Sequence, residues 1–225
     1  MGTSANKINI LRRIHKLLLK EYGKIKPWKK SPLDTLVAVI LSQNTNDKNS
    51  FAAFKILKRR FGKWDELLDA PIPQIAKLIK AGGLANIKAK RIKTVLSEIK
   101  GKEGKLSLNR LRSMEPQAAR NYLMQFKGIG PKSAAVIVAF AFEKPAFPID
   151  THIFRVLKRL PLLSEKIAYT NAHILMEEMV PDELKIPLHT EIITHGRKVC
   201  RARMPLCNTC VLYAECERVG VVKFA

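Results

Sequence analysis

The sequence predicts an all-α protein of about ten helices, and three observations support this fold class. Apolar residues recur at steps of three and four along nearly the whole chain, which is the spacing of a helix face. The interruptions are short and contain Gly or Pro, as in APIP, AGG and KGIGP. No stretch shows the sustained apolar–polar alternation of a strand. A β-sheet is therefore not expected.

The apolar spacing also gives the order of the helices. The first four apolar faces contain Ile10, Ile14, Leu17 and Leu18, then Leu33, Leu36, Val37, Ile40 and Leu41, then Phe51, Phe54, Leu57 and Phe61, and then Ile87, Val95, Leu96 and Ile99. Further helices are expected over 116–126, 131–142, 151–160, 165–179 and 183–194. The second helix follows Ser31-Pro32, because proline suits a first helical turn. The fourth follows Gly82-Gly83.

The charge of the chain points to a polyanionic partner. The 225 residues include 41 Lys+Arg and 19 Asp+Glu, a formal net charge of +22. Nucleic acid is the leading partner class for such a field, ahead of an anionic membrane surface. The alternative is a lysine-rich solvated surface, but this usually carries matching acidic residues, which are few here.

Membrane residence is not expected. The longest apolar run, Ser133 to Phe142, has ten residues, and a spanning helix needs about 20. The N-terminus lacks the apolar core and cleavage site of a signal peptide. The sequence therefore predicts a soluble, intracellular protein in which structural disulfides are rare.

The stretch FKGIGPKSA, residues 126–134, predicts a helix–hairpin–helix turn. Gly128 can end the first helix in the left-handed conformation, and Pro131 suits the first turn of the next. Backbone amides between Gly128 and Lys132 would then be largely unpaired and could hold a DNA phosphate without reading sequence. A tight turn with no ligand is the alternative.

Lys132 and Asp150 are the candidate catalytic residues. Lys132 lies in the first turn of a helix with an apolar flank, and both features favour loss of its proton, as a Schiff-base nucleophile requires. The alternative role is a plain phosphate contact. Asp150 begins the next helix, so a loop could return its carboxylate towards Lys132. Asp150 could also simply cap that helix, and the two roles are compatible.

The four cysteines predict a metal centre. They lie in the last 26 residues, with the spacing Cys200-x6-Cys207-x2-Cys210-x5-Cys216. Such clustering in an intracellular chain favours metal over disulfides. Zinc usually uses two closely spaced pairs, and only Cys207 and Cys210 form one here, so an iron–sulfur cluster also fits. A metal-tied loop could present Arg201 and Arg203 to phosphates.

Together these motifs resemble the endonuclease III family of helix–hairpin–helix DNA glycosylases. The matching segments are LMQFKGIGPKSAAVIV, FPIDTHIFRVLKRL and HGRKVC-x6-C-x2-C-x5-C. The resemblance runs from about residue 8 to 216. It implies a six-helix barrel domain, 29–135, and an iron–sulfur cluster domain, 1–28 with 136–225, with a DNA cleft between them. The helix–hairpin–helix, about 118–142, crosses that boundary.

The resemblance further implies a cofactor, a reaction and a partner. Cys200, Cys207, Cys210 and Cys216 would hold a [4Fe-4S] cluster. Lys132 would attack C1′ of a flipped-out nucleotide with help from Asp150, and the resulting Schiff base would allow β-elimination. The implied protein is a monomeric DNA glycosylase and AP lyase of base excision repair. It would bind double-stranded DNA with damaged bases, oxidised pyrimidines first, or abasic sites, in the cytoplasm or nucleoid.

The candidate DNA contacts lie in the hairpin, in two wedge loops and beside the cysteines. They are Gln43, Asn44, Leu84, Lys127, Gly128, Ile129, Gly130, Arg201 and Arg203. Both wedge loops depart from the family pattern. The family's L-S-A-Q-A-T-D is L-S-Q-N-T-N-D here, which puts Asn44 at the gap-filling glutamine, and its G-L-Y-N is G-L-A-N.

These departures leave other functions open. The Q-N-T-N run is closer to the Q-Q-T-Q of the adenine glycosylase branch, which however lacks the lysine. Leu84 could also be an ordinary core leucine. The alternatives are a mismatch- or other-lesion-specific glycosylase of the same superfamily and a non-catalytic DNA-binding protein.

Overall fold

A computed structural model describes residues 4–25 and 31–225, and every regular element in those ranges is a helix. The predicted all-α fold class is confirmed. The chain divides into two compact units, Lys29–Lys144 and Met1–Trp28 with Pro145–Ala225. The boundary expected after Ala135 would cut a helix in two. The structure instead places that whole helix, Pro131–Ala141, in the first unit.

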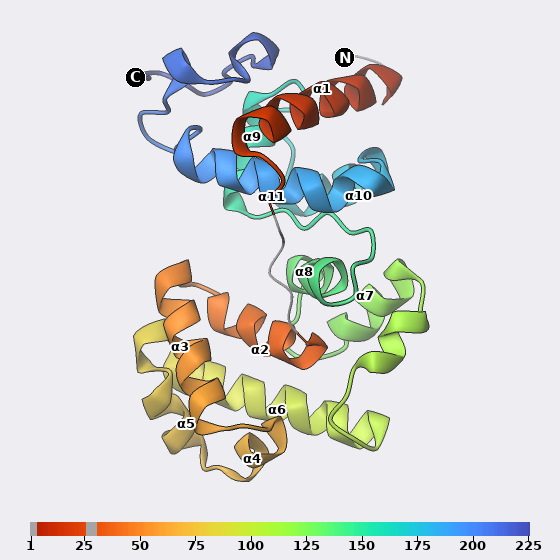
Figure 1. The fold of residues 1–225 in the computed structure, drawn as a ribbon, viewed down its shortest axis with the longest axis vertical. Coiled ribbons are helices and arrows are strands. Elements are labelled where there is room, and N and C mark those ends of the chain that lie inside the picture. The colour runs from red at the N-terminus through yellow and green to blue at the C-terminus, as the bar shows by residue number, and fades with distance from the viewer. Residues whose placement is uncertain (1–3, 26–30) are drawn as a thin grey trace. The chain divides into compact units, whose positions relative to one another are not determined.

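The unit Lys29–Lys144 is built on a long helix, α6, which contacts α2, α4 and α5 (Figure 1). The bounds of its elements are α2 Pro32–Ser42, α3 Asp47–Arg60, α4 Trp64–Asp69, α5 Ile72–Leu78, η1 Lys80–Gly82, α6 Ala85–Glu103, η2 Asn109–Ser113, α7 Pro116–Met124 and α8 Pro131–Ala141. α2 also packs against α3 and α8, and α7 packs against α8. The helix–hairpin–helix is therefore α7, the glycine turn and α8.

Local signals begin and end these helices. The Ser31 hydroxyl accepts a hydrogen bond from the Asp34 amide at 3.1 Å, which satisfies a free amide at the start of α2. Asn46 caps α3 in the same way through the Asn49 amide at 2.9 Å. α4 and α5, only six and seven residues long, were absent from the helices expected from the sequence.

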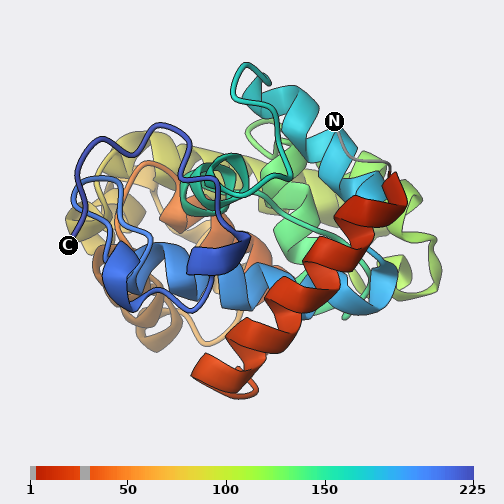
Figure 2. The ribbon, with the colours of Figure 1, turned by 90° about the horizontal axis from the view of Figure 1, so that it is seen from above.

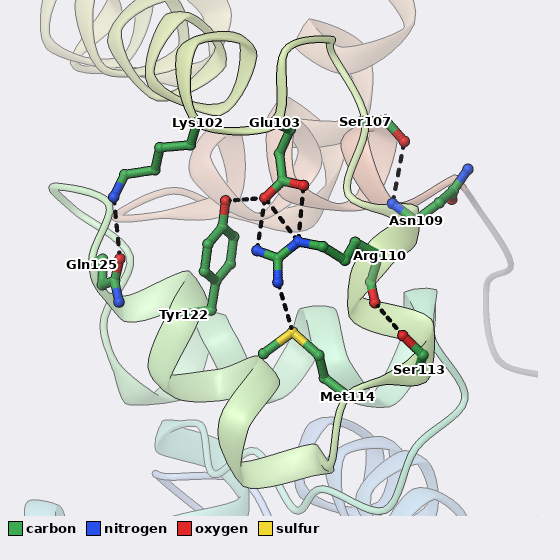
Figure 3. Close-up of polar contacts among 9 residues, drawn as sticks. All are labelled: Lys102, Glu103, Ser107, Asn109, Arg110, Ser113, Met114, Tyr122 and Gln125. Carbon is green, nitrogen blue, oxygen red and sulfur yellow. Dashed lines mark hydrogen bonds and ion pairs between the residues drawn. The ribbon is translucent and has the colours of Figure 1, made fainter.

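A polar cluster ties the end of α6 to α7 (Figure 3). The Glu103 carboxylate accepts hydrogen bonds from Arg110 Nη2 at 2.9 Å and from the Tyr122 hydroxyl. The Arg110 guanidinium also lies over the Tyr122 ring. Tyr122 in turn packs edge-on against Phe126, which is buried where the hairpin begins. The cluster therefore fixes the first hairpin helix to the rest of its unit.

The second unit places α1 across α11 (Figures 1 and 2). The bounds of its elements are α1 Ser4–Tyr22, α9 Thr151–Arg159, α10 Tyr169–Met179, α11 Asp182–Lys198, η3 Cys207–Thr209 and η4 Tyr213–Glu215. α9 also packs on α11, and the approach is close at Gly196. A Cβ there would lie 3.1 Å from His152 Cβ. α10 begins at Tyr169, four residues later than expected.

No helix in the part of the chain that the structure describes is both long enough and apolar enough to cross a bilayer.

Candidate functional site

The glycine turn has the backbone conformation predicted for a hairpin. Gly128 has φ +90°, which a residue with a side chain rarely adopts, whereas Gly130 has an ordinary φ of −89°. Ile129 differs from the expectation of free amides, because its N–H donates to the Phe126 carbonyl at 3.0 Å and its side chain is buried. The N–H groups of Gly128, Gly130 and Lys132 donate to no acceptor among the described residues. These three amides can receive a phosphate.

Lys132 is the second residue of α8 and is exposed. The residues that follow it, Ser133, Ala134 and Ala135, are buried against the rest of the unit. Lys132 therefore lies at the exposed start of α8, just before the buried part of the helix, and its amine is in solvent. Lys127, on the other side of the turn, is exposed as well. The hairpin therefore carries two accessible amines beside three free amides.

Gln43 is bound to the hairpin by its side chain. Its Nε2 donates to the Gly128 carbonyl at 2.9 Å and lies 3.4 Å from the Ser133 hydroxyl. Its Oε1 accepts from Nη1 of Arg91 on α6. With donor and acceptor both engaged, the amide links α6, the end of α2 and the glycine turn. Gln43 thus supports the hairpin, and its predicted DNA contact stays a prediction.

Arg91 occupies the space beside Gly128. A Cβ built on Gly128 would lie 2.3 Å from Arg91 Nε and 2.6 Å from its Cδ. Gly128 is therefore required both by its φ angle and by this neighbour. Sequence reasoning missed Arg91. Arg91 follows Ile87 by four residues and Leu84 by seven, about one and two helical turns, so it lies on the same face of α6 as Ile87, and this was the available signal.

The two wedge loops expose the residues that the sequence singled out. Asn44 follows Gln43 in the left-handed conformation, with φ +51°, and is exposed. Leu84 has φ +50° and half of its side chain is exposed, so it is not the core leucine considered as an alternative. Non-glycine residues in this conformation are uncommon and cluster at functional sites.

A depression of about 230 Å³ adjoins the hairpin. It is lined by Ile87, Lys90, Arg91, Thr94 and Lys127. Three of these five side chains are cationic, and the apolar one, Ile87, is more than half exposed. A surface of this kind suits an anionic polymer with apolar parts, as a nucleic acid is.

Asp150 caps α9 in the second unit. Its Oδ1 accepts from the Ile153 amide at 2.7 Å, and the residue is only 7% exposed. The capping role is therefore confirmed. Lys132 and Asp150 belong to different units, so their joint action stays a prediction.

Two arginines of α9 reach the cysteine region. Arg159, itself buried, donates from Nη1 to Cys200 Sγ at 3.3 Å and to the Arg201 carbonyl at 2.7 Å. Arg155 donates from Nε to the Cys200 carbonyl at 3.0 Å. Cationic donors beside sulfur stabilise thiolates. Both arginines lie within the FPIDTHIFRVLKRL segment, but the sequence assigned them no role.

A buried histidine also adjoins the cysteine region. His195 Nε2 lies 3.5 Å from Cys210 Sγ, and its Nδ1 lies 3.0 Å from the Tyr22 hydroxyl. Burial lowers the pKa of His195 to about 4, so the imidazole is neutral. Tyr22 is the last residue of α1, so His195 connects this N-terminal helix to the cysteine-bearing segment.

The four cysteines are the residues that would hold the metal centre expected from the sequence. All four are free thiols, and burial together with the charges of the other three cysteines raises the pKa of Cys210 to about 11. The thiols are therefore near neighbours. Yet no three Cys, His, Asp or Glu side chains in the described ranges are close enough to hold one metal ion. The iron–sulfur cluster expected from the sequence therefore stays a prediction.

Arg201 and Arg203 are both exposed on the loop between Cys200 and Cys207. Arg201 Nε donates to the Lys198 carbonyl at 3.1 Å, at the end of α11. Met204, which follows Arg203 in this loop, has φ +47° and is half exposed. The loop thus presents both guanidinium groups outward, and their contact with phosphate stays a prediction.

Comparison with known proteins gives the family. Residues 37–182 match the HhH-GPD superfamily base excision DNA repair proteins. Endonuclease III of Sulfolobus acidocaldarius is 37% identical over 81% of this chain and 80% of its own. A candidate DNA glycosylase of Arabidopsis thaliana is 38% identical over 76% of this chain, which spans 58% of that protein.

A solved structure shows the same fold. A trapped endonuclease III–DNA covalent intermediate superposes with a TM-score of 0.81 and 26% identity, and the match covers 97% of both chains. The chain therefore belongs to the endonuclease III family of the HhH-GPD superfamily of base excision DNA repair proteins.

Proposed function

We propose that this base excision repair DNA glycosylase is bifunctional: it removes a damaged base, an oxidised pyrimidine first of all, and then cuts the DNA at the abasic site. Family membership supports the glycosylase. The lyase rests on one observation, the exposed amine of Lys132 directly after a hairpin with free amides. A phosphate held by those amides would fix the sugar's distance from the amine.

The chemistry follows from an amine nucleophile. Lys132 Nζ forms a bond to C1′ of the sugar, the glycosidic bond breaks, and the base leaves with that bond's electron pair and takes up a proton. Opening of the sugar ring gives an iminium ion. Loss of a C2′ proton then expels the 3′ phosphate, and water releases the lysine. Asp150 is proposed to accept the proton of the lysine and to stabilise the developing positive charge.

The cysteines are proposed to hold a [4Fe-4S] cluster, which would supply a rigid structural tie rather than a reacting group. Arg159 would hold the Cys200 sulfur and the loop carbonyl of Arg201 in place through the bonds described above. The loop would then present Arg201 and Arg203 to the DNA backbone.

Borohydride trapping on abasic duplex DNA tests the lyase. Wild-type protein should form a covalent adduct, because borohydride reduces the iminium ion to a stable amine. Lys132→Ala should form none. Lys127→Ala is the matched control, since it removes an exposed amine from the same turn; it should weaken DNA binding and keep the adduct. No adduct with wild-type protein, or an equal adduct with Lys132→Ala, would refute the lyase.

A panel of duplexes tests the lesion. Each contains one damaged or mismatched base opposite each of the four bases, and base release is measured separately from strand cutting. Oxidised pyrimidines should be released fastest. Preference for a mismatch would favour the alternative glycosylase, which the altered Asn44 loop leaves open. Binding to abasic DNA without release of any base would favour a non-catalytic DNA-binding protein.

A further inference from the structure

Lys88 of α6 is a buried cation. Only 1% of the residue is exposed, and its Nζ donates to the carbonyls of Leu41 and Gly82, each at 2.8 Å. No carboxylate in the described ranges pairs with this ammonium. Burial lowers the pKa of Lys88, and the charge of Arg91 lowers it further.

This arrangement is costly, so a packing role alone does not explain it. An apolar side chain of the same length would fill the space without the penalty of removing a cation from water. Only a hydrogen-bond donor can hold two carbonyl groups at one point. The two carbonyls here come from segments 41 residues apart along the chain, Leu41 and Gly82.

Each carbonyl lies at the C-terminal end of a helix, where helix dipoles are negative and carbonyls lack partners within the helix. Leu41 is next to last in α2, and Gly82 is the last residue of η1. A cation at that point is favourable for both helix ends. It also closes the space between them.

The two helix ends lead directly into the wedge loops. Gln43 and Asn44 follow Leu41 by two and three residues, and Leu84 follows Gly82 by two. Asn44 and Leu84 are both exposed and both left-handed. A single ammonium group therefore anchors the last helical residues before both strained loops.

We propose that Lys88 is a positioning residue that sets the two wedge loops, residues 43–46 and 83–86, in fixed relation to each other for insertion into damaged DNA. The proposal rests on the proposed function, because it takes both loops as DNA contacts. Lys88 itself touches no DNA in this account. It acts through Asn44 and Leu84.

The test compares Lys88→Met with Lys93→Met. Lys93 lies on the same helix and donates from Nζ to one helix-end carbonyl, that of Ala70 after α4, remote in sequence from the wedge loops. Both variants lose a lysine–carbonyl tie from α6. In hydrogen exchange on the free proteins, Lys88→Met should speed exchange of the amides in 42–46 and 83–86 together. Lys93→Met should leave both loops unchanged.

The functional readout is base unstacking, measured as the fluorescence of 2-aminopurine beside a tetrahydrofuran abasic analogue. Lys88→Met should reduce the rate of unstacking by about tenfold or more, the scale on which small misplacements act. The effect of Leu84→Ala should be smaller in the Lys88→Met background than in wild type, because the two residues would act on one event. If Lys88 had only a structural role, the effects of Lys88→Met and Leu84→Ala on the unstacking rate would be independent.

The outcomes separate the inference from the proposed function. If wild-type protein produces no unstacking, the wedge function fails and with it the premise. If wild type unstacks the probe and Lys88→Met does so equally fast, Lys88 is no positioning residue. Should Lys88→Met fail to fold, Lys88→Gln replaces it: its side chain is one bond shorter than that of lysine, so its amide nitrogen does not reach the point where the two carbonyls meet, and unchanged loops and unstacking in that variant would overturn the proposal.

Discussion

Replacing Gly128 with alanine would disturb the hairpin in two ways that the structure separates. The backbone at this position has φ +90°, and a Cβ would lie 2.3 Å from Arg91 Nε. The first effect belongs to the backbone alone. The second requires the Arg91 side chain to move, which breaks its hydrogen bond to Gln43.

The two effects can be given rough sizes. A left-handed backbone costs an alanine about 1–2 kcal/mol. Moving Arg91 loses a hydrogen bond with a charged donor in a partly exposed setting, worth about 1 kcal/mol. Gly128→Ala should therefore lower the free energy of unfolding by about 2–3 kcal/mol in total.

Urea unfolding of single and double variants measures both parts. Arg91→Ala alone should cost about 1 kcal/mol, and adding Gly128→Ala to it should cost only the backbone part, about 1–2 kcal/mol. Gly130→Ala is the matched control, because Gly130 has φ −89° and nothing within 4 Å of its Cβ position. It should stay within about 0.5 kcal/mol of wild type. The reasoning fails if Gly128→Ala is as stable as wild type or if Gly130→Ala costs as much.

Three other predictions concern the second unit and the α6–α7 cluster. Asp150→Asn should keep the cap of α9 and the stability of the protein but lose base release. Asp150→Ala should lose base release and also about 1 kcal/mol of stability in urea unfolding. Full base release by Asp150→Asn would show that Asp150 serves only as a helix cap. Arg110 and Tyr122 hydrogen bonds hold the pKa of Glu103 below its usual value, so the stability that Glu103 adds is present above about pH 4.5 and lost as pH falls through the lowered pKa. The difference between wild type and Glu103→Gln in urea unfolding should therefore shrink at low pH, and a constant difference would contradict the assignment. Protein purified without oxygen should be brown and contain about four irons per chain, and Cys200→Ala should lose both colour and iron; stoichiometric zinc in place of iron would contradict a cluster.

The hairpin and most helices could be predicted from sequence because their signals are local. The turn is set by the backbone preferences of its own residues, Gly128, Gly130 and Pro131. The amphipathic spacing likewise repeats within each helix. The short helices α4 and α5 were not predicted, because six or seven residues make too few helical turns to show a periodic apolar spacing. The sequence of the turn also gave no sign that all of α8 packs with the helices before it.

The sequence by itself singled out the residues proposed to carry chemistry, namely Lys132, Asp150 and the four cysteines, and their roles stay predictions. Only the tertiary structure decided how the loops around the hairpin are held. Gln43 reaches a carbonyl 85 residues away, and Lys88 reaches one 47 residues away. Such bonds leave no spacing pattern in the chain, because they depend on how helices pack rather than on the residues between the partners. For that reason Gln43 and Asn44, adjacent in sequence, have different roles in the fold: one supports the hairpin and the other is exposed beside it.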